Sequence, residues 1–158
     1  EEDKFLGRLA GGAGDDPLRW VRDAVASAQN GVIVLNAGAR NAGLHFICRD
    51  VWLKVDSITS AWTSRYEWGA ELLVPLKSGE GRYVASEAVL DELEGEGRVV
   101  FRYAENPNGS MRDIAGISSA DGRVVGLMPH PEHATEPLTG PSDDGLGLFY
   151  SALDAVLV

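Results

Sequence analysis

The sequence is short of cysteine, of positive charge and of long hydrophobic runs. Its 158 residues contain one cysteine, Cys48, so an intramolecular disulfide and a cysteine-only zinc site are excluded. A single thiol fits a reducing compartment, and we expect a cytoplasmic protein. Against 24 acidic residues there are 14 lysines and arginines, which gives a net charge of −10. Because an acidic surface repels phosphate backbones, we do not expect nucleic-acid binding.

Two kinds of segment are also missing. No apolar run approaches the roughly 20 residues that a membrane helix requires, so no membrane association is expected. The first ten residues lack the pattern of a signal peptide. No repeat, linker or low-complexity segment interrupts the chain, and its length suits one compact domain over residues 1–158.

The apolar residues predict alternating helices and strands. A helix over residues 16–29 precedes a continuous apolar run at 32–35, which is typical of a buried strand in a parallel sheet. A helix followed by a tight turn and a buried strand indicates an α/β layer. A long strand is expected at residues 44–55, where the apolar phase changes near residues 49–50 and predicts a bulge.

The rest of the chain adds further strands and two helices. Pro75 places the strand at 72–76 near a sheet edge. A short helix over 86–94 leads to a strand over 98–103. Residues 114–117 and 124–128 form a hairpin with Asp121-Gly122 at its turn. A closing helix over residues 145–158 is predicted to bury Leu146, Phe149, Leu153 and Val156.

Five stretches, in order along the chain, resemble one protein family. They include Gly-Glu-Gly-Arg-Tyr at residues 79–83, Asn-Pro-Asn-Gly-Ser at 106–110 and Pro-His-Pro-Glu at 129–132. The whole set covers residues 40–51, 61–66, 79–85, 106–117 and 126–133. It resembles the PurQ family, the glutaminase subunits of phosphoribosylformylglycinamidine synthase, within the class I glutamine amidotransferases.

The resemblance implies both a fold and a chemistry. The fold would be a flavodoxin-like sheet with helices on both faces, here shortened at the N-terminus. The substrate would be glutamine, whose ammonia passes to a synthetase subunit of phosphoribosylformylglycinamidine synthase in purine biosynthesis. In this family a cysteine thiolate attacks the amide, a histidine transfers protons and a glutamate orients the histidine. The Pro-His-Pro-Glu match assigns the histidine to His130 and the glutamate to Glu132.

The nucleophile is where the sequence departs from the family. PurQ proteins carry a Gly-x-Cys-x-Gly turn between a buried strand and a helix, which places the thiol above the helix N-terminus. Here the strand at 32–35 runs through residues 36–40 into the next matching stretch, so the turn and its helix are missing. Cys48 lies in a strand pattern, where a lone cysteine is usually a small buried hydrophobe. We therefore predict no glutaminase activity.

Two other functions stay open. The chain could be a non-catalytic regulatory or assembly partner of the synthetase subunit, with the stretches at 79–85 and 106–117 facing that partner. It could also be a different enzyme that combines His130 with another nucleophile, of which Cys48 is one candidate.

Other polar residues give weaker signals. Glu80 and Arg82 resemble the family's polar loop near the site and the synthetase contact, although a solvated turn explains them equally well. His45 and His133 have no spacing partners that would form a metal site. We therefore expect neither a metal nor a cofactor.

Overall fold

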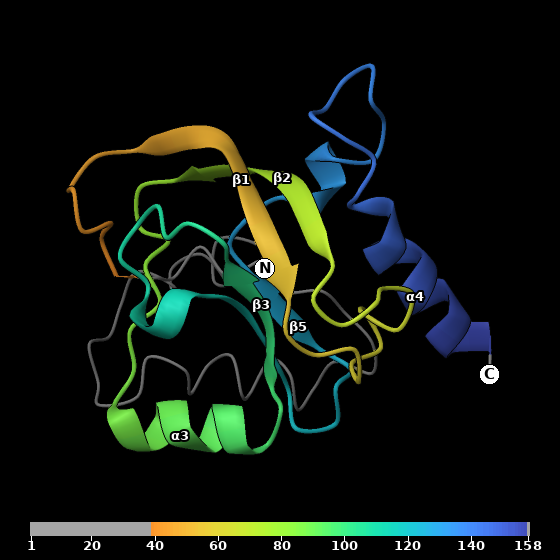
Figure 1. Ribbon diagram of the computed structural model, residues 1–158, viewed down its shortest axis with the longest axis horizontal. Helices are drawn as coiled ribbons and strands as arrows, with labels where there is room; N and C mark the ends of the chain where they lie inside the picture. The colour runs from red at the N-terminus through yellow and green to blue at the C-terminus, as the bar shows by residue number, and fades with distance from the viewer. Residues whose placement is uncertain (1–38, 158) are drawn as a thin grey trace, which may run out of the picture.

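The computed structural model describes residues 39–157 and has a curled antiparallel sheet at its centre (Figure 1). Its strands are β1 Ile47–Val55, β2 Glu71–Ser78, β3 Val99–Tyr103, β4 Ile114–Ser118 and β5 Val125–Leu127. They pair in the order β2-β1-β3-β4-β5. The helices are α3 Glu87–Gly95 and α4 Leu146–Leu157, and the 3₁₀ turns are η1 Met111–Asp113 and η2 Pro131–His133. The helix and strand predicted at 16–29 and 32–35 lie outside the described residues.

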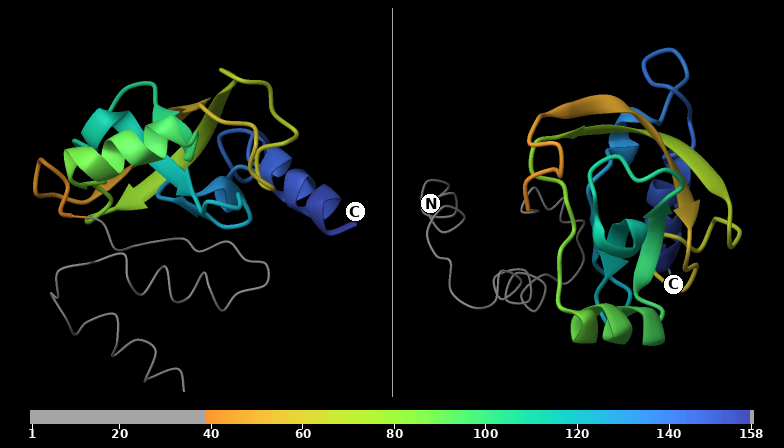
Figure 2. Two further views of the ribbon diagram at one scale, coloured as in Figure 1. Left: turned by 90° about the horizontal axis from the view of Figure 1, so that it is seen from below. Right: turned by 60° about the vertical axis from the view of Figure 1, so that its left-hand side comes forward.

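The two helices pack on opposite faces of the sheet. Ile114 of β4 packs with Leu90 and Leu93 of α3. The next residue, Ala115, belongs to the hydrophobic cluster that contains Leu148 of α4. Because successive strand residues point to opposite faces, α3 and α4 cover different faces. Figure 2 shows them at opposite ends of the curled sheet. The predicted α/β class is confirmed, and the strands described in residues 39–157 are all antiparallel.

Several predicted elements are confirmed, each with a local cause. Strand β2 is an edge strand, as Pro75 indicated, because proline has no N–H to offer a second neighbouring strand. The β4–β5 hairpin turns at Gly122, whose φ of +69° is accessible to glycine without steric strain. Helix α3 begins after Ser86, whose hydroxyl accepts a hydrogen bond from the backbone N–H of Val89.

Strand β1 contains no bulge, which corrects the prediction for residues 49–50. Its register with β2 runs without a shift from Ile47 to Lys54. The apparent change of phase arises because Leu44 and Phe46 are not core residues; they are 77% and 64% exposed. Leu44 also has a φ of +59°, which is incompatible with a strand. The strand therefore begins after Leu44 and keeps a single inward phase.

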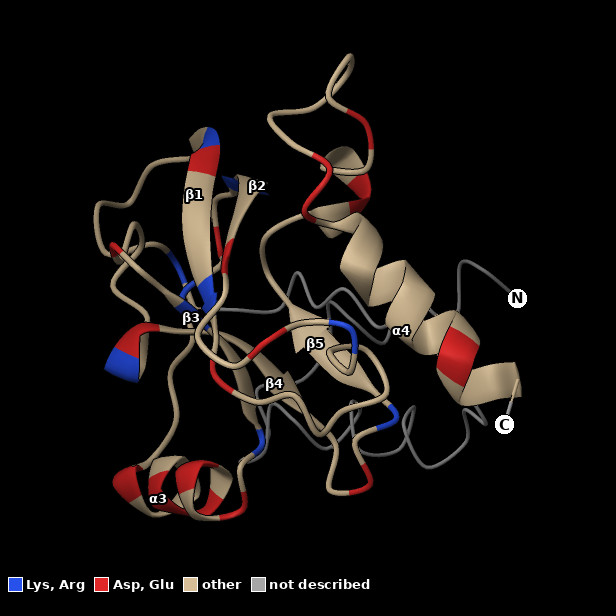
Figure 3. Cartoon of the chain, turned by 45° about the vertical axis from the view of Figure 1, so that its right-hand side comes forward, with Lys and Arg blue, Asp and Glu red and all other residues tan. Residues whose placement is uncertain are grey.

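The buried face of α4 is not the predicted one, which was Leu146, Phe149, Leu153 and Val156. The helix instead buries Leu148 and Ser151, while Leu153 and Val156 are 56% and 65% exposed. Ser151 is buried because its hydroxyl donates to a carbonyl of the preceding turn and accepts a backbone N–H from the loop after β1. Figure 3 shows that α4 is nearly free of charge. No helix within residues 39–157 is long and apolar enough to cross a membrane.

Candidate functional site

The turn after β5 holds the two residues that the sequence nominated for proton transfer. Strand β5 ends at Leu127, and the 3₁₀ turn η2 follows within a few residues. Prolines on both sides of His130 restrict the backbone of the turn. The backbone N–H of His130 donates to the carbonyl of Pro75 at 2.8 Å. The turn is therefore fixed to the free edge of β2.

His130 and Glu132 form a hydrogen-bonded pair in this turn. Nδ1 of His130 lies 2.7 Å from Oε1 of Glu132. When Nδ1–H donates to the carboxylate, Nε2 is left as a proton acceptor. The side chains are 23% and 43% exposed, so the pair is open to solvent. The arrangement lets the imidazole take up a proton at Nε2 while the carboxylate stabilises the resulting charge.

His133 joins this pair, which corrects the prediction that it has no partner at metal-site spacing. Its ring stacks on that of His130, with centroids 5.4 Å apart and planes inclined by 19°. One ligand atom from each of His130, Glu132 and His133 lies within 4.8 Å of the other two. A 3₁₀ turn has three residues per turn, so side chains at positions i and i+3 are eclipsed. The signal was present in the sequence as two histidines three residues apart with proline between them.

Cys48 lies on β1 and is exposed, whereas the sequence predicted a buried thiol. It is opposite Lys77 of β2 in the strand register. Strand β2 lies between β1 and the backbone of His130. Neighbouring backbones that share hydrogen bonds in a sheet are about 4.8 Å apart, and two such distances separate β1 from His130. Within residues 39–157 no hydrogen bond joins the Cys48 thiol to His130. The structure therefore does not bring the single thiol together with the predicted base.

Two buried asparagines fix the loop after β2, which carries Glu80. Asn41 and Asn108 are each 1% exposed. Oδ1 of Asn41 accepts the backbone N–H of Gly81 at 3.2 Å, and Nδ2 of Asn108 donates to the Gly81 carbonyl at 2.8 Å. A Cβ at Gly81 would lie 3.1 Å from Cε of Met128, so the loop backbone is packed against the residue that follows β5. The loop is thereby placed beside the site.

The two polar residues of this loop have different partners. Glu80 is exposed and lies 3.8 Å from the Arg40 guanidinium, a distance typical of a weak surface ion pair. Nε of Arg82 donates to the carbonyl of Gly109 at 2.9 Å. Arg82 therefore ties the loop to the Asn-Pro-Asn-Gly-Ser segment, and Glu80 is left facing solvent.

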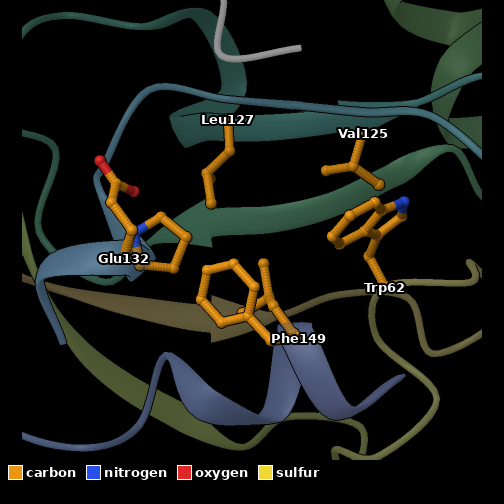
Figure 4. Close-up of a pocket in the computed structure, with 7 residues that line it drawn as sticks. Trp62, Val125, Leu127, Glu132 and Phe149 are labelled. Carbon is orange, nitrogen blue, oxygen red and sulfur yellow. The ribbon is translucent and has the colours of Figure 1, made fainter. Parts of the chain in front are cut away.

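An apolar cavity of about 260 Å³ lies beside Glu132. Figure 4 shows Glu132 at one end and Trp62 at the other, with Phe149 between them. The lining residues are Trp62, Val125, Leu127, Pro131, Glu132, Leu148 and Phe149. A site for an amide-bearing amino acid needs several convergent polar groups. Since Glu132 is the one charged residue in this lining, the cavity alone does not provide glutamine recognition.

The start of α4 is anchored both to β2 and to the turn η2. The Tyr66 hydroxyl donates to the carbonyl of Asp144 at 2.6 Å, and the Asp144 carboxylate accepts the backbone N–H of Leu73 at 2.7 Å. Burial raises the pKa of Tyr66 well above its usual range, so this donor stays protonated. The backbone N–H of Gly145 donates to the carbonyl of Ala134, just after η2, at 2.8 Å. Helix α4 therefore supports the turn that carries the histidines.

Comparison with known proteins gives the family. A sequence profile of the CobB/CobQ-like glutamine amidotransferase domain matches residues 37–150, which is more than half of the chain. The chain belongs to this family. The matched range includes the turn that carries His130 and Glu132.

Similar proteins refine this family membership. The chain is 83% identical over 118 residues to the phosphoribosylformylglycinamidine synthase subunit PurQ of Mycobacterium tuberculosis H37Rv, a match that covers 75% of this chain and 53% of that protein. For the same subunit of Corynebacterium jeikeium the identity is 55% over 141 residues, covering 89% and 63%. The solved structure of PurLQS from Thermotoga maritima matches with a TM-score of 0.67 and 38% identity, covering 75% of this chain and 51% of that chain.

These matches confirm the resemblance to the PurQ family that the sequence motifs indicated. They also agree with the α/β fold of the glutamine amidotransferase domain, since the matched structure superposes on three quarters of the chain. The chain spans about half the length of the curated relatives that it matches.

Proposed function

We propose that this chain is a PurQ-type glutamine amidotransferase subunit that keeps His130 arranged as a general base, with Glu132 as the residue that orients it. The 2.7 Å contact between Nδ1 and Oε1 carries this proposal, because it frees Nε2 to accept a proton. The same imidazole would return that proton to the departing ammonia. The family description supports glutamine as the substrate, and relatives named as subunits of phosphoribosylformylglycinamidine synthase support a synthetase subunit as the partner.

We also propose that the chain does not hydrolyse glutamine, either alone or with the synthetase subunit. Acyl transfer needs a nucleophile within hydrogen-bond reach of the base, about 3 Å. Cys48 is the single thiol of the sequence, and β2 lies between its strand and His130. Within the part of the chain that the structure describes, no hydroxyl or thiol forms a hydrogen bond with the His130 ring. Among the residues that the structure describes, the base therefore has no group to activate.

A thiol-reactive glutamine analogue tests this second proposal on the intact chain. Because Cys48 is exposed, a general thiol reagent should modify it, and Cys48→Ser should remove that reaction. The glutamine analogue should show no labelling that excess glutamine protects. Glutamine-protected labelling of Cys48 would overturn the proposal and would favour the alternative of a different enzyme built on this thiol.

An assembly role with the synthetase subunit is favoured by one specific feature, the fixed surface of the loop that carries Glu80. Asn41, Asn108 and Arg82 hold this loop against the Asn-Pro-Asn-Gly-Ser segment. Such a preformed surface loses little conformational entropy when a partner binds. The exposed Glu80 carboxylate is one charge that this surface presents.

Binding to the synthetase subunit tests the assembly role. Glu80→Arg should weaken the complex about tenfold in a pull-down or interferometry titration, because a reversed charge opposes the partner surface. Glu92→Arg is the matched control, since Glu92 is equally exposed and its nearest cation, Arg98, is 3.6 Å away. If the unmodified chain does not bind the synthetase subunit, or if both variants weaken binding equally, this role is wrong.

A further inference from the structure

The turn η2 gathers two imidazoles and a carboxylate within one short segment. Ligand atoms of His130, Glu132 and His133 lie within 4.8 Å of one another. All three come from four consecutive residues whose backbone is fixed by flanking prolines and by the bond to Pro75. The donors therefore converge through the local fold of the turn.

The chemistry of these donors selects a class of cation. Two imidazole nitrogens with one carboxylate oxygen suit zinc and neighbouring transition metals. Calcium and magnesium prefer sets made of oxygen alone. Within residues 39–157, Nε2 of His130 has no hydrogen-bond partner, so its lone pair is accessible when Nδ1–H donates to Glu132. On His133 the lone pair is on Nδ1, because that atom accepts from the Lys77 ammonium.

We propose that His130, Glu132 and His133 form a binding site for a divalent transition-metal ion such as Zn²⁺. Ligand atoms around tetrahedral zinc lie about 3.4 Å apart, so the three groups must close by little more than 1 Å. The exposed His133 ring and Glu132 carboxylate can make this adjustment by side-chain rotation toward the half-buried His130 ring. Since the turn is open to solvent, water would complete the coordination.

One neighbouring charge opposes the metal. Nζ of Lys77 lies 3.2 Å from Nδ1 of His133, so its ammonium shares this site with any bound cation. Removing that charge should strengthen Zn²⁺ binding about thirtyfold, from the repulsion of a double and a single charge about 4 Å apart in water. The Lys77 ammonium therefore competes with a metal ion for this site. Removing it should raise the affinity for the metal, whereas removing a ligand should lower that affinity.

Metal binding at this turn does not depend on the roles proposed above for glutamine chemistry. It would, however, exclude them while the metal is bound, because His130 and Glu132 would serve as ligands. The site therefore makes the same two residues available either to a proton or to a metal ion.

Calorimetric titration of the intact chain with Zn²⁺ alone tests the proposal. We expect one ion per chain, with affinity reduced about tenfold or more in His133→Gln and in Glu132→Gln. His45→Gln and Cys48→Ser are matched controls, because His45 is the third histidine of the sequence and Cys48 is its single thiol. Both controls should bind like the parent chain, and Lys77→Met should bind about thirtyfold more tightly.

Histidine ring resonances provide a second measurement that does not rely on the folding of any variant. Zn²⁺ should shift the ring signals of His130 and His133 and leave those of His45 in place. Absence of 1:1 binding, equal shifts in all three rings, or unchanged affinity in His133→Gln would each overturn the proposal.

Discussion

Cys48 lies directly opposite Lys77 in the β1–β2 register, and the Lys77 ammonium extends to His133, 3.2 Å away. Strand β2 and its Lys77 side chain thus lie between the Cys48 strand and the histidine turn. Lysine spans this gap because its side chain is long, whereas the cysteine side chain is short. The relationship explains why an exposed thiol on the same sheet does not complete a site with His130.

Gly145 sets the separation between α4 and the histidine turn. A Cβ at this position would lie 2.1 Å from the carbonyl oxygen of Pro131, which no side-chain rotation can relieve. We expect Gly145→Ala to lower the free energy of unfolding by about 1–3 kcal/mol. Gly95→Ala is the control, because nothing lies within 4 Å of its added methyl, and it should be neutral or slightly stabilising. Urea denaturation distinguishes the two, and equal stabilities would contradict the close packing.

Asn108 should contribute far more to stability than its exposed neighbour Asn106. The buried Asn108 side chain accepts the N–H and the hydroxyl of Ser110 and donates to the Gly81 carbonyl. Truncation leaves these buried groups without partners, so Asn108→Ala should lower the free energy of unfolding by about 2–3 kcal/mol.

The control for this prediction is Asn106→Ala. The Asn106 side chain also bonds to the backbone of the same loop, but water can replace an exposed partner. We expect a loss below about 1 kcal/mol. Chemical denaturation of both variants decides the point, and a larger loss for Asn106→Ala would show that burial does not govern these bonds.

The raised pKa of Tyr66 predicts a loss of folding stability in alkaline solution. Burial raises the pKa of Tyr66 above its ordinary value of 10.0. Because the folded-state pKa is the higher one, its contribution is fully present below about pH 10 and is lost as the pH rises further. Tyr66→Phe should therefore flatten the alkaline fall in stability, while it removes a hydrogen bond worth about 1 kcal/mol at neutral pH.

The matched control is Tyr150→Phe, since Tyr150 is half exposed on α4. This variant removes an exposed hydroxyl and should leave the stability at neutral pH unchanged. Free energies of unfolding at about pH 8 and about pH 11 suffice for the comparison. If the stability of Tyr66→Phe falls with pH as steeply as that of the parent chain, the half-buried Tyr66 phenol does not drive the alkaline loss.

The elements that could be predicted from the sequence are those with a local cause. Proline in β2 indicated an edge strand, and a turn glycine marked the β4–β5 hairpin. The failures came from burial, which depends on distant partners. Leu44 and Phe46 fit a strand pattern yet face outward, and α4 buries Ser151 because the loop after β1 supplies a hydrogen bond. No local pattern reveals such a partner.

The candidate site was predictable in its residues but not in its contacts. The Pro-His-Pro-Glu motif nominated His130 and Glu132, and the structure places their side chains 2.7 Å apart. The motif did not reveal the stacking of His133 on His130, which depends on the 3₁₀ conformation of the turn. Lys77 was missed because it approaches from another strand, 56 residues away in sequence.

Ammonia release from glutamine tests the separation of base and nucleophile most directly. We predict that the intact chain, alone or with the synthetase subunit, releases no more ammonia than its His130→Ala variant. The reason is that His130 and Glu132 are in place while the single thiol lies beyond β2. Ammonia release by the parent chain that His130→Ala abolishes would contradict this conclusion.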